Sequence, residues 1–181
     1  TFDGQGHYIT GLKYENADKD CVGLFGQTNS ATIKNVGLKN AHFVGNANTG
    51  GIVGRMYAGT VSSCAVLDSY IEGRDHVGAI AGEINNLEQG EGDTKEYIGG
   101  TVSDNFSNSQ IKSRQYQAGG IIGTITCGTL ERNLFAGTDD CPGRSTGMAA
   151  LVDRNDAPSV IRNNVAAFSH IYGETDCIII N

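Results

Sequence analysis

A short, glycine-rich apolar motif recurs along the chain with a period of 28 residues. Its clearest copies read Gly-Gly-Ile-Val-Gly at residues 50–54 and Gly-Gly-Ile-Ile-Gly at 119–123. Five copies end at residues 26, 54, 82, 123 and 151, so one interval is 41 residues and the others are 28. A second series of β-like segments begins at residues 32, 60, 101, 129 and 160 with nearly the same spacing. Both series place an insertion of 13 residues at about 85–97.

A unit of this size cannot bury its own apolar face and must stack on copies of itself. Each unit contains three short β-like runs, for example 32–38, 41–44 and 50–53, separated by Gly or Asn. The 26 glycines and only 2 prolines suit strands joined by tight turns. The repeat therefore predicts an all-β fold, a right-handed single-stranded parallel β-helix of about five to six coils. We expect one domain over 1–181, with an irregular last coil at about 138–181.

Equivalent positions of successive units form apolar columns, which are the predicted core. The two columns contain Ile33, Val61, Val102, Leu130 and Ile161, and Leu24, Ile52, Ile80, Ile121 and Ala149. Because neighbouring side chains of a strand face opposite sides, we expect the Leu24 column inside and the column next to it outside, partly covered. That outer column contains Phe25, Val53, Ala81 and Ile122. Asparagines at equivalent corners predict hydrogen-bonded ladders of Asn35, Asn105, Asn133, Asn163 and Asn164.

Four of the five motif copies end in glycine, and these glycines define the repeat. They are Gly26, Gly54, Gly82 and Gly123. A corner that needs a positive φ explains glycine at a fixed place in every coil, since β-branched residues reach that region only with strain. We therefore predict φ above zero at three or more of the four positions. Close backbone packing is the alternative explanation.

Charge and cysteine content exclude several classes of function. Thirteen basic and 20 acidic residues give a net charge of -7, which argues against nucleic acid as a partner. The longest aliphatic stretch, 178–180, is far shorter than the roughly 20 residues that cross a bilayer, so direct membrane insertion is not expected. Five cysteines lack zinc-ligand spacing, and no metal or other cofactor is expected. Cys127 and Cys141 are the one pair considered for a disulfide.

Four acidic residues form the candidate binding loop, because parallel β-helices include polysaccharide lyases and hydrolases. Asp139 and Asp140 fall in the predicted loop 137–145, and Asp153 and Asp156 in the matching loop one unit later. Carboxylates about 5 to 9 Å apart can supply the acid and base of glycoside cleavage. A solvated loop edge is the preferred alternative, since no aromatic platform accompanies these residues. The acidic insertion is likewise interpreted as a solvated protrusion in preference to a calcium site.

The motif copies at 50–54 and 119–123, with the lead-in at residues 2–12, resemble the bacterial GLUG repeat family over about 1–137. The resemblance implies a secreted or surface-exposed β-solenoid, as found in adhesin-like proteins and beside the peptidase domain of immunoglobulin A1 peptidases. Peptidase activity does not carry over, because such enzymes need H-E-x-x-H on a helix. None of the four histidines is followed by Glu.

The sequence thus predicts a non-catalytic adhesion, display or stalk module of an extracellular or cell-surface bacterial protein. Its expected partners are other domains of the same polypeptide and a host protein or glycan ligand. A carbohydrate-active β-helix enzyme and the accessory region of a surface metallopeptidase are the alternatives. An enzyme would show a side groove with clustered carboxylates, bound calcium or aromatic walls, whereas a display module would bear flat, polar faces.

Overall fold

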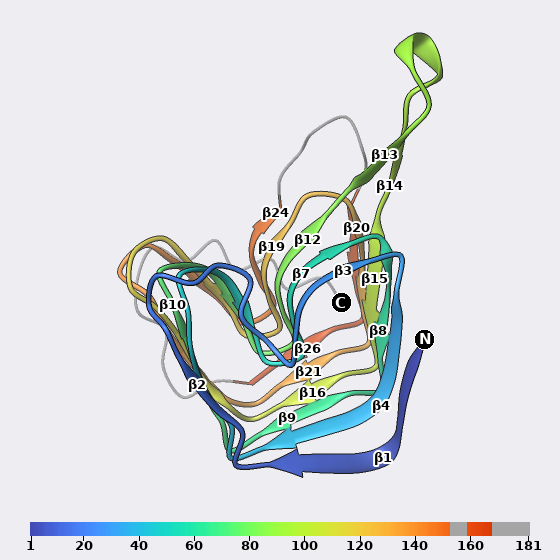
Figure 1. The fold of residues 1–181 in the computed structure, drawn as a ribbon. Coiled ribbons are helices and arrows are strands. Elements are labelled where there is room, and N and C mark those ends of the chain that lie inside the picture. Colours follow the sequence, from blue (N-terminus) through green and yellow to red (C-terminus); the bar gives the residue numbers. More distant parts are fainter. Residues whose placement is uncertain (153–158, 168–181) are drawn as a thin grey trace.

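The computed structural model describes residues 1–152 and 159–167. They form an all-β parallel solenoid of about six turns with a repeat of about 28 residues, as predicted. The right-handed sense of the coil stays a prediction. Figure 1 looks along the solenoid, so that successive coils overlie one another. Each coil is hydrogen-bonded to the next through parallel strands along most of its outline. Within the described residues, no helix has the length and apolarity needed to span a bilayer.

Four parallel sheets enclose the core, which we name A to D. Sheet A contains β1 (Phe2–Thr10), β4 (Thr32–Lys39), β8 (Gly59–Ser62), β9 (Ala65–Leu67), β15 (Gly100–Ser103), β16 (Phe106–Ser107), β20 (Gly128–Glu131), β21 (Leu134–Phe135), β25 (Ser159–Arg162) and β26 (Val165–Ala166). Sheet B contains β2 (Lys13–Glu15), β5 (His42–Val44), β10 (Tyr70–Gly73), β17 (Gln110–Ser113) and β22 (Thr138–Asp140). Sheet C contains β6 (Ala47–Gly50), β11 (Asp75–Gly78), β18 (Gln117–Gly119) and β23 (Arg144–Thr146). Sheet D contains β3 (Phe25–Asn29), β7 (Val53–Tyr57), β12 (Ala81–Asn85), β19 (Ile122–Ile125) and β24 (Ala149–Val152).

Each coil therefore has more strands than the three that the sequence predicts. Sheet A turns a corner within each coil, for example between β8 and β9, and its two legs lie at the right and bottom of Figure 1. Sheets C and D run inward from the outline and meet at the apolar motif. Residues 51 and 52 form a bend there, which ends β6 and begins β7. The motif is thus an inward-pointing corner rather than part of one strand.

The insertion is an antiparallel hairpin that projects from the solenoid at the upper right of Figure 1. It consists of β13 (Leu87–Gln89), the short 3-10 helix η1 (Gly92–Thr94) and β14 (Glu96–Ile98). Lys95 forms an ion pair with Glu88 at 2.7 Å. The Lys95 ammonium also lies 5.4 Å from the centre of the Tyr97 ring. Its strands pair only with each other, so the hairpin is an addition to the coil and not a part of its sheets.

The first predicted core column is confirmed. Ile33, Val61, Val102, Leu130 and Ile161 are paired in this order across sheet A. The first four are at most 2% exposed.

The prediction for the second pair of columns is only half right. Ile52, Ile80 and Ile121 are fully buried, as expected, but Val53, Ala81 and Ile122 are fully buried too. All six belong to one apolar cluster, so the column next to the Leu24 column is not an outer stripe. Side chains alternate between faces only within a continuous strand. The bend at the motif interrupts the strand, and both columns reach the interior.

The prediction of positive φ at the motif glycines is wrong. None of Gly26, Gly54, Gly82 and Gly123 has a positive φ. A Cβ atom added at Gly54 would lie 2.5 Å from the carbonyl carbon of Cys21, and one at Gly82 would lie 2.5 Å from that of Asn48. A Cβ at Gly123 would likewise collide with the backbone of His76. Glycine is required because sheet D packs closely on the backbone of sheet C in the preceding coil.

Left-handed residues do occur at a fixed corner, but they are not glycines. One such column lies at the corner of sheet A, with φ between 52° and 59° at Asn35, Ser63, Asp104, Arg132 and Asn163. Polar residues tolerate this conformation because their side chains can bond locally.

The described cysteines Cys21, Cys64, Cys127 and Cys141 are free thiols. The one disulfide considered from the sequence, between Cys127 and Cys141, is therefore not formed. Burial raises the pKa of both of these thiols, which favours their inert, protonated forms. Cys177 lies outside the described residues.

Candidate functional site

The predicted acidic loop is replaced by strand β22, which separates its two carboxylates. Asp139 continues the buried column Phe43, Ile71 and Ile111 of sheet B and is 2% exposed. Asp140 points the other way and is exposed. Asp153 and Asp156 lie outside the described residues. The structure thus does not bring Asp139 and Asp140 together on one face.

Asp139 is a carboxylate in an otherwise apolar column. Neither of its oxygens has a hydrogen bond of good geometry to any described residue. Burial raises the pKa of Asp139 to about 6, although the nearby Ser145 hydroxyl acts in the opposite direction. The charged form is disfavoured because no counter-charge offsets its lost hydration.

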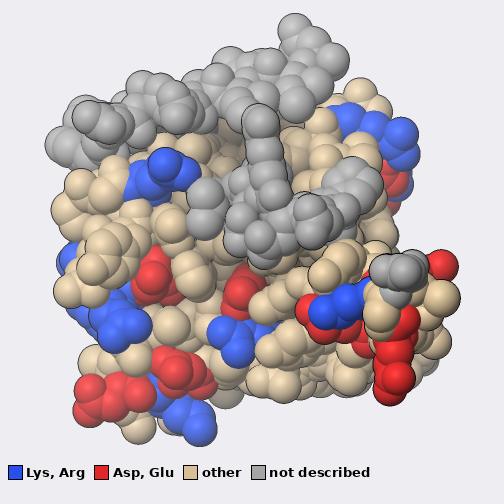
Figure 2. Space-filling model, turned by 90° about the horizontal axis from the view of Figure 1, so that it is seen from above, with Lys and Arg blue, Asp and Glu red and all other residues tan. Residues whose placement is uncertain are grey.

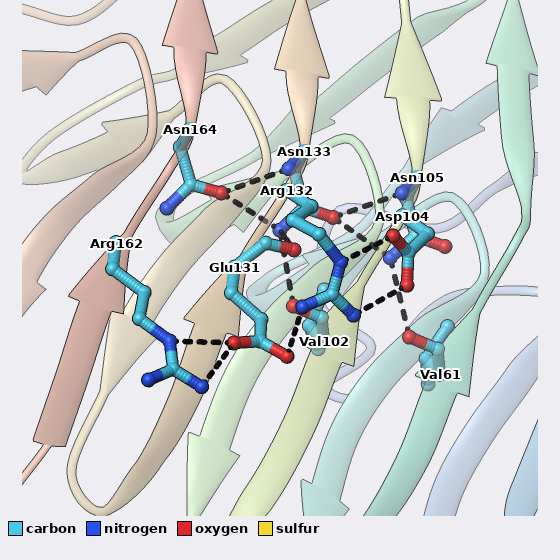
Figure 3. A network of polar contacts seen from close by, with 9 residues as sticks. All are labelled: Val61, Val102, Asp104, Asn105, Glu131, Arg132, Asn133, Arg162 and Asn164. Carbon is cyan, nitrogen blue, oxygen red and sulfur yellow. Dashed lines mark hydrogen bonds and ion pairs between the residues drawn. The ribbon is translucent and has the colours of Figure 1, made fainter. Parts of the chain in front are cut away.

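An asparagine ladder joins the last three described coils at the corner of sheet A (Figure 3). Asn105 donates from Nδ2 to Asn133 Oδ1 at 2.9 Å, and Asn133 donates in the same way to Asn164 Oδ1 at 3.0 Å. The Asn105 amide also donates to the Val61 carbonyl and accepts from the Cys64 backbone N–H. The predicted ladder is confirmed for these three residues. Asn35 and Asn163 instead occupy the neighbouring left-handed column.

Charged side chains flank this ladder on the outside and are paired with one another (Figure 3). Asp104 accepts two hydrogen bonds from Arg132, at 2.7 and 2.9 Å. Glu131 lies between Arg162 and Arg132, and both guanidinium groups lower the pKa of Glu131. The Asp104 pKa is lowered chiefly by its bonds to Arg132. Because each of these charges already has its counter-charge, we infer that the network holds neighbouring coils together.

We expect Asn105→Ala to lower the free energy of unfolding by about 3 kcal/mol, because the buried Cys64 N–H and Val61 carbonyl lose their partner. Asp104→Asn is the matched control, because asparagine tolerates the φ of 59° at this position and the change weakens only exposed hydrogen bonds to Arg132. It should cost a small fraction of that loss. Urea denaturation of the two variants measures both effects. Equal losses would contradict a structural role for the buried ladder.

A second polar cluster lies in the seam, which we define as the inward fold between sheets C and D that holds Asn48, Arg55, His76 and Glu83. Arg55 Nε donates to Glu83 Oε2 at 2.5 Å. With its amide oriented to suit its neighbours, Asn48 donates to Glu83 and to His76 Nδ1 and accepts from Arg55. Burial lowers the pKa of Arg55, but Glu83 more than offsets this and raises it overall. Glu83, which precedes the insertion expected at about 85–97, lies in β12 with these partners.

A shallow groove of about 450 Å³ lies outside the corner between sheets A and B. Its lining contains Asn40, Ala41, His42, Asp68, Ser69, Tyr70, Asn108 and Gln110. The His42 and Tyr70 rings are stacked, with their centres 4.9 Å apart. Asp68 is its one carboxylate, so the clustered acids expected of an enzyme groove are not among these residues.

The sequence carries a signal for this groove that the sequence analysis missed. Three successive coils have Asn or Asp, then a small residue, then a planar polar or aromatic one, at residues 40–42, 68–70 and 108–110. The middle residues Ala41, Ser69 and Ser109 are buried. Ser69 Oγ accepts from the Ala41 N–H, and Ser109 Oγ accepts from the Ser69 N–H. These bonds fix the corner, so that the flanking side chains project outward.

Charges of both signs are interspersed on the face seen in Figure 2. Blue and red side chains lie beside one another and are separated by uncharged surface, so this face carries no large patch of one sign. Among the described residues, no group of three or more His, Cys, Asp or Glu side chains is arranged to hold a metal ion.

Comparison with known proteins reveals one partial similarity. The chain is 33% identical to halomucin from Haloquadratum walsbyi over 85 residues. These residues are 46% of this chain but 1% of halomucin, so the chain matches a very small part of a very long protein. No family model matches the chain, and the GLUG resemblance stays a prediction. No solved structure matches it.

Proposed function

We propose that this chain is a non-catalytic repeat module of a secreted or cell-surface protein, serving as an adhesion, display or stalk segment. The observation that carries the proposal is the continuous register of its coils. From β1 to β26, the same outline repeats, and equivalent positions stack in columns. Solenoids of this kind gain stability from each added neighbour and present extended faces.

The partial similarity to halomucin supports a place in a large protein, because the match covers 46% of this chain but 1% of the length of halomucin. The resemblance to GLUG repeats supports a secreted or cell-surface location. The ligands and the activity of the whole protein are likewise proposals. Its partners would be neighbouring domains of the same polypeptide and an external ligand.

A non-catalytic role is supported by the state of the charged groups. Arg132, Glu131 and Arg162 are paired at the sheet A corner, and Arg55 and Glu83 are paired in the seam. Asp139 and Asp140 point to opposite sides of β22. General acid and base catalysis needs titratable side chains held within hydrogen-bond reach of the substrate atoms that gain or lose a proton.

Incubation with uronic-acid and neutral polysaccharides, with and without calcium, tests this role. We expect no release of reducing ends or unsaturated products above that of heat-denatured protein. Any release by the native protein would contradict the non-catalytic role. Loss of that release in Asp140→Asn or Asp153→Asn would assign it to the carboxylates that the sequence singled out.

A further inference from the structure

We propose that the groove outside the corner of sheets A and B binds a neutral saccharide chain. Six side chains would contact it: Asn40, His42, Asp68, Tyr70, Asn108 and Gln110. The proposal adds a ligand to the display role and can fail without affecting it, because the display role is tested by product release.

The groove is built from two side-chain positions repeated on three successive coils. Tyr70 is paired with His42 on one side and with Gln110 on the other. Since neighbouring parallel strands lie about 4.8 Å apart, these side chains extend roughly 10 Å along the solenoid. Lys13 and Thr138 occupy the equivalent position in the coils on either side. The pattern thus begins and ends within the described coils, as expected of a site of limited length.

The groove offers hydrogen-bonding groups that the fold does not use. The side-chain amides of Asn40 and Gln110 form no hydrogen bond with the rest of the described chain. Asp68 Oδ1 accepts from Asn108 Nδ2 at 2.9 Å, which leaves Oδ2 available. Amide and carboxylate groups present paired donors and acceptors that match adjacent sugar hydroxyls, which both donate and accept.

Tyr70 supplies an apolar surface whose position is fixed. Its ring is stacked on His42, and its hydroxyl donates to Glu72. Burial and this hydrogen bond raise the pKa of Tyr70, so the ring stays neutral near pH 7. Aromatic rings carry partial negative charge on their faces and attract partly positive C–H groups, such as those on one side of a sugar ring. A rigid ring beside free amides suits a ligand with alternating apolar and hydroxyl surfaces.

The charges near the groove favour a neutral ligand over an anionic one. Asp68 places a negative charge within the lining. Two of the nearby cations are already paired: Lys13 with Glu15 at 3.1 Å, and Arg114 with Glu72 at 2.8 Å. Lys39, next to Asn40 in the sequence, forms no ion pair within the described chain. The lining itself contains no Lys or Arg, so an acidic sugar or a phosphate would meet repulsion from Asp68 there.

The backbone at the groove argues against an extended peptide as the ligand. The N–H groups of Asn40, Tyr70 and Gln110 donate to carbonyls of neighbouring coils. A peptide that adds a strand needs free main-chain donors and acceptors at a sheet edge. In the described groove, the unused hydrogen-bonding groups belong to side chains, which suits a ligand that is recognised through its hydroxyl groups.

Isothermal titration calorimetry with cellohexaose, maltohexaose, mannohexaose and the hexamer of galacturonic acid tests the proposal. We expect the protein to bind at least one neutral hexasaccharide more tightly than the acidic hexamer. Tyr70→Leu should weaken that binding by about tenfold, because the ring surface is lost. Tyr116→Leu is the matched control, since Tyr116 is 57% exposed but does not line the groove, and it should leave affinity unchanged.

Further variants separate binding from folding. Tyr70→Phe keeps the ring and should keep most of the affinity. Asn40 has a φ of 53°, so Asn40→Gly removes its side chain without backbone strain. Asn40→Gly and Gln110→Ala remove exposed side chains that bond nothing else in the described chain, so they should weaken binding without lowering the melting temperature. Failure to bind any neutral hexasaccharide, tighter binding of the acidic hexamer, or unchanged affinity in Asn40→Gly and Gln110→Ala together would overturn the proposal.

Discussion

Replacing Gly82 by alanine is expected to lower the free energy of unfolding by at least about 3 kcal/mol, because the added methyl group meets backbone that cannot move aside. Its Cβ would lie 2.5 Å from the Asn48 carbonyl carbon and 2.6 Å from the Gly54 carbonyl oxygen. Both atoms belong to coils held by hydrogen bonds along the solenoid. Urea denaturation of Gly82→Ala measures the loss, and failure to fold is the extreme form of the same result.

Asparagine substitutions distinguish close packing from a requirement for positive φ. Asparagine tolerates the left-handed region but is larger than alanine. At Gly82, Gly82→Asn should therefore be no better than Gly82→Ala. Gly6 is the matched control, because its φ is 77° and an added Cβ would have no neighbour within 4 Å. Gly6→Ala should cost about 1 kcal/mol, and Gly6→Asn should recover part of it. Recovery at Gly82 instead would contradict the packing explanation.

Replacing Asp139 by asparagine should remove a pH dependence of stability. The pKa of Asp139 is raised from 3.8 to about 6 in the folded protein, so the folded state holds its proton more tightly than the unfolded state. Stability from this group is complete below about pH 4 and is lost as the pH rises through about 6. The loss amounts to about 3 kcal/mol, since each pKa unit corresponds to about 1.4 kcal/mol. Asp139→Asn cannot ionise and should be relatively more stable at pH 8 than at pH 4.

Urea denaturation of both proteins between pH 4 and 8 checks this expectation. The difference between variant and wild type isolates Asp139, because groups such as Glu131, whose lowered pKa gives the opposite pH dependence, are common to both. Asp140→Asn is the control on the exposed side of the same strand and should show no such difference. A constant difference between Asp139→Asn and wild type across this range would refute a buried, unpaired carboxylate.

Much of the fold follows from the sequence alone because a repeat places equivalent residues in register. The spacing of 28 residues predicts which residues stack, and Ile33, Val61 and Val102 are paired as the spacing requires. The Asn105, Asn133 and Asn164 ladder is predictable for the same reason. In a parallel solenoid, residues that lie one period apart in the sequence become neighbours in space, so the period alone predicts many long-range contacts.

The direction of the chain within one coil was decided only by the tertiary structure. The sequence does not show that the motif at 50–54 bends inward, because a bend and a strand can have the same apolar residues there. That bend places Val53 in the core and brings Gly82 against the backbone near Asn48. It also separates the role of glycine from that of the left-handed corner, which polar residues such as Asn35 supply.

The candidate sites show the same division. The sequence identifies Asp139 as acidic, but only the strand register of β22 shows that it faces the core while Asp140 faces solvent. The repeated polar pattern at 40–42, 68–70 and 108–110 is present in the sequence. Its meaning depends on the corner between sheets A and B, which gathers the three copies into one groove. Periodicity determines which residues become neighbours, whereas the path of each coil determines whether those neighbours lie inside, outside or in a seam.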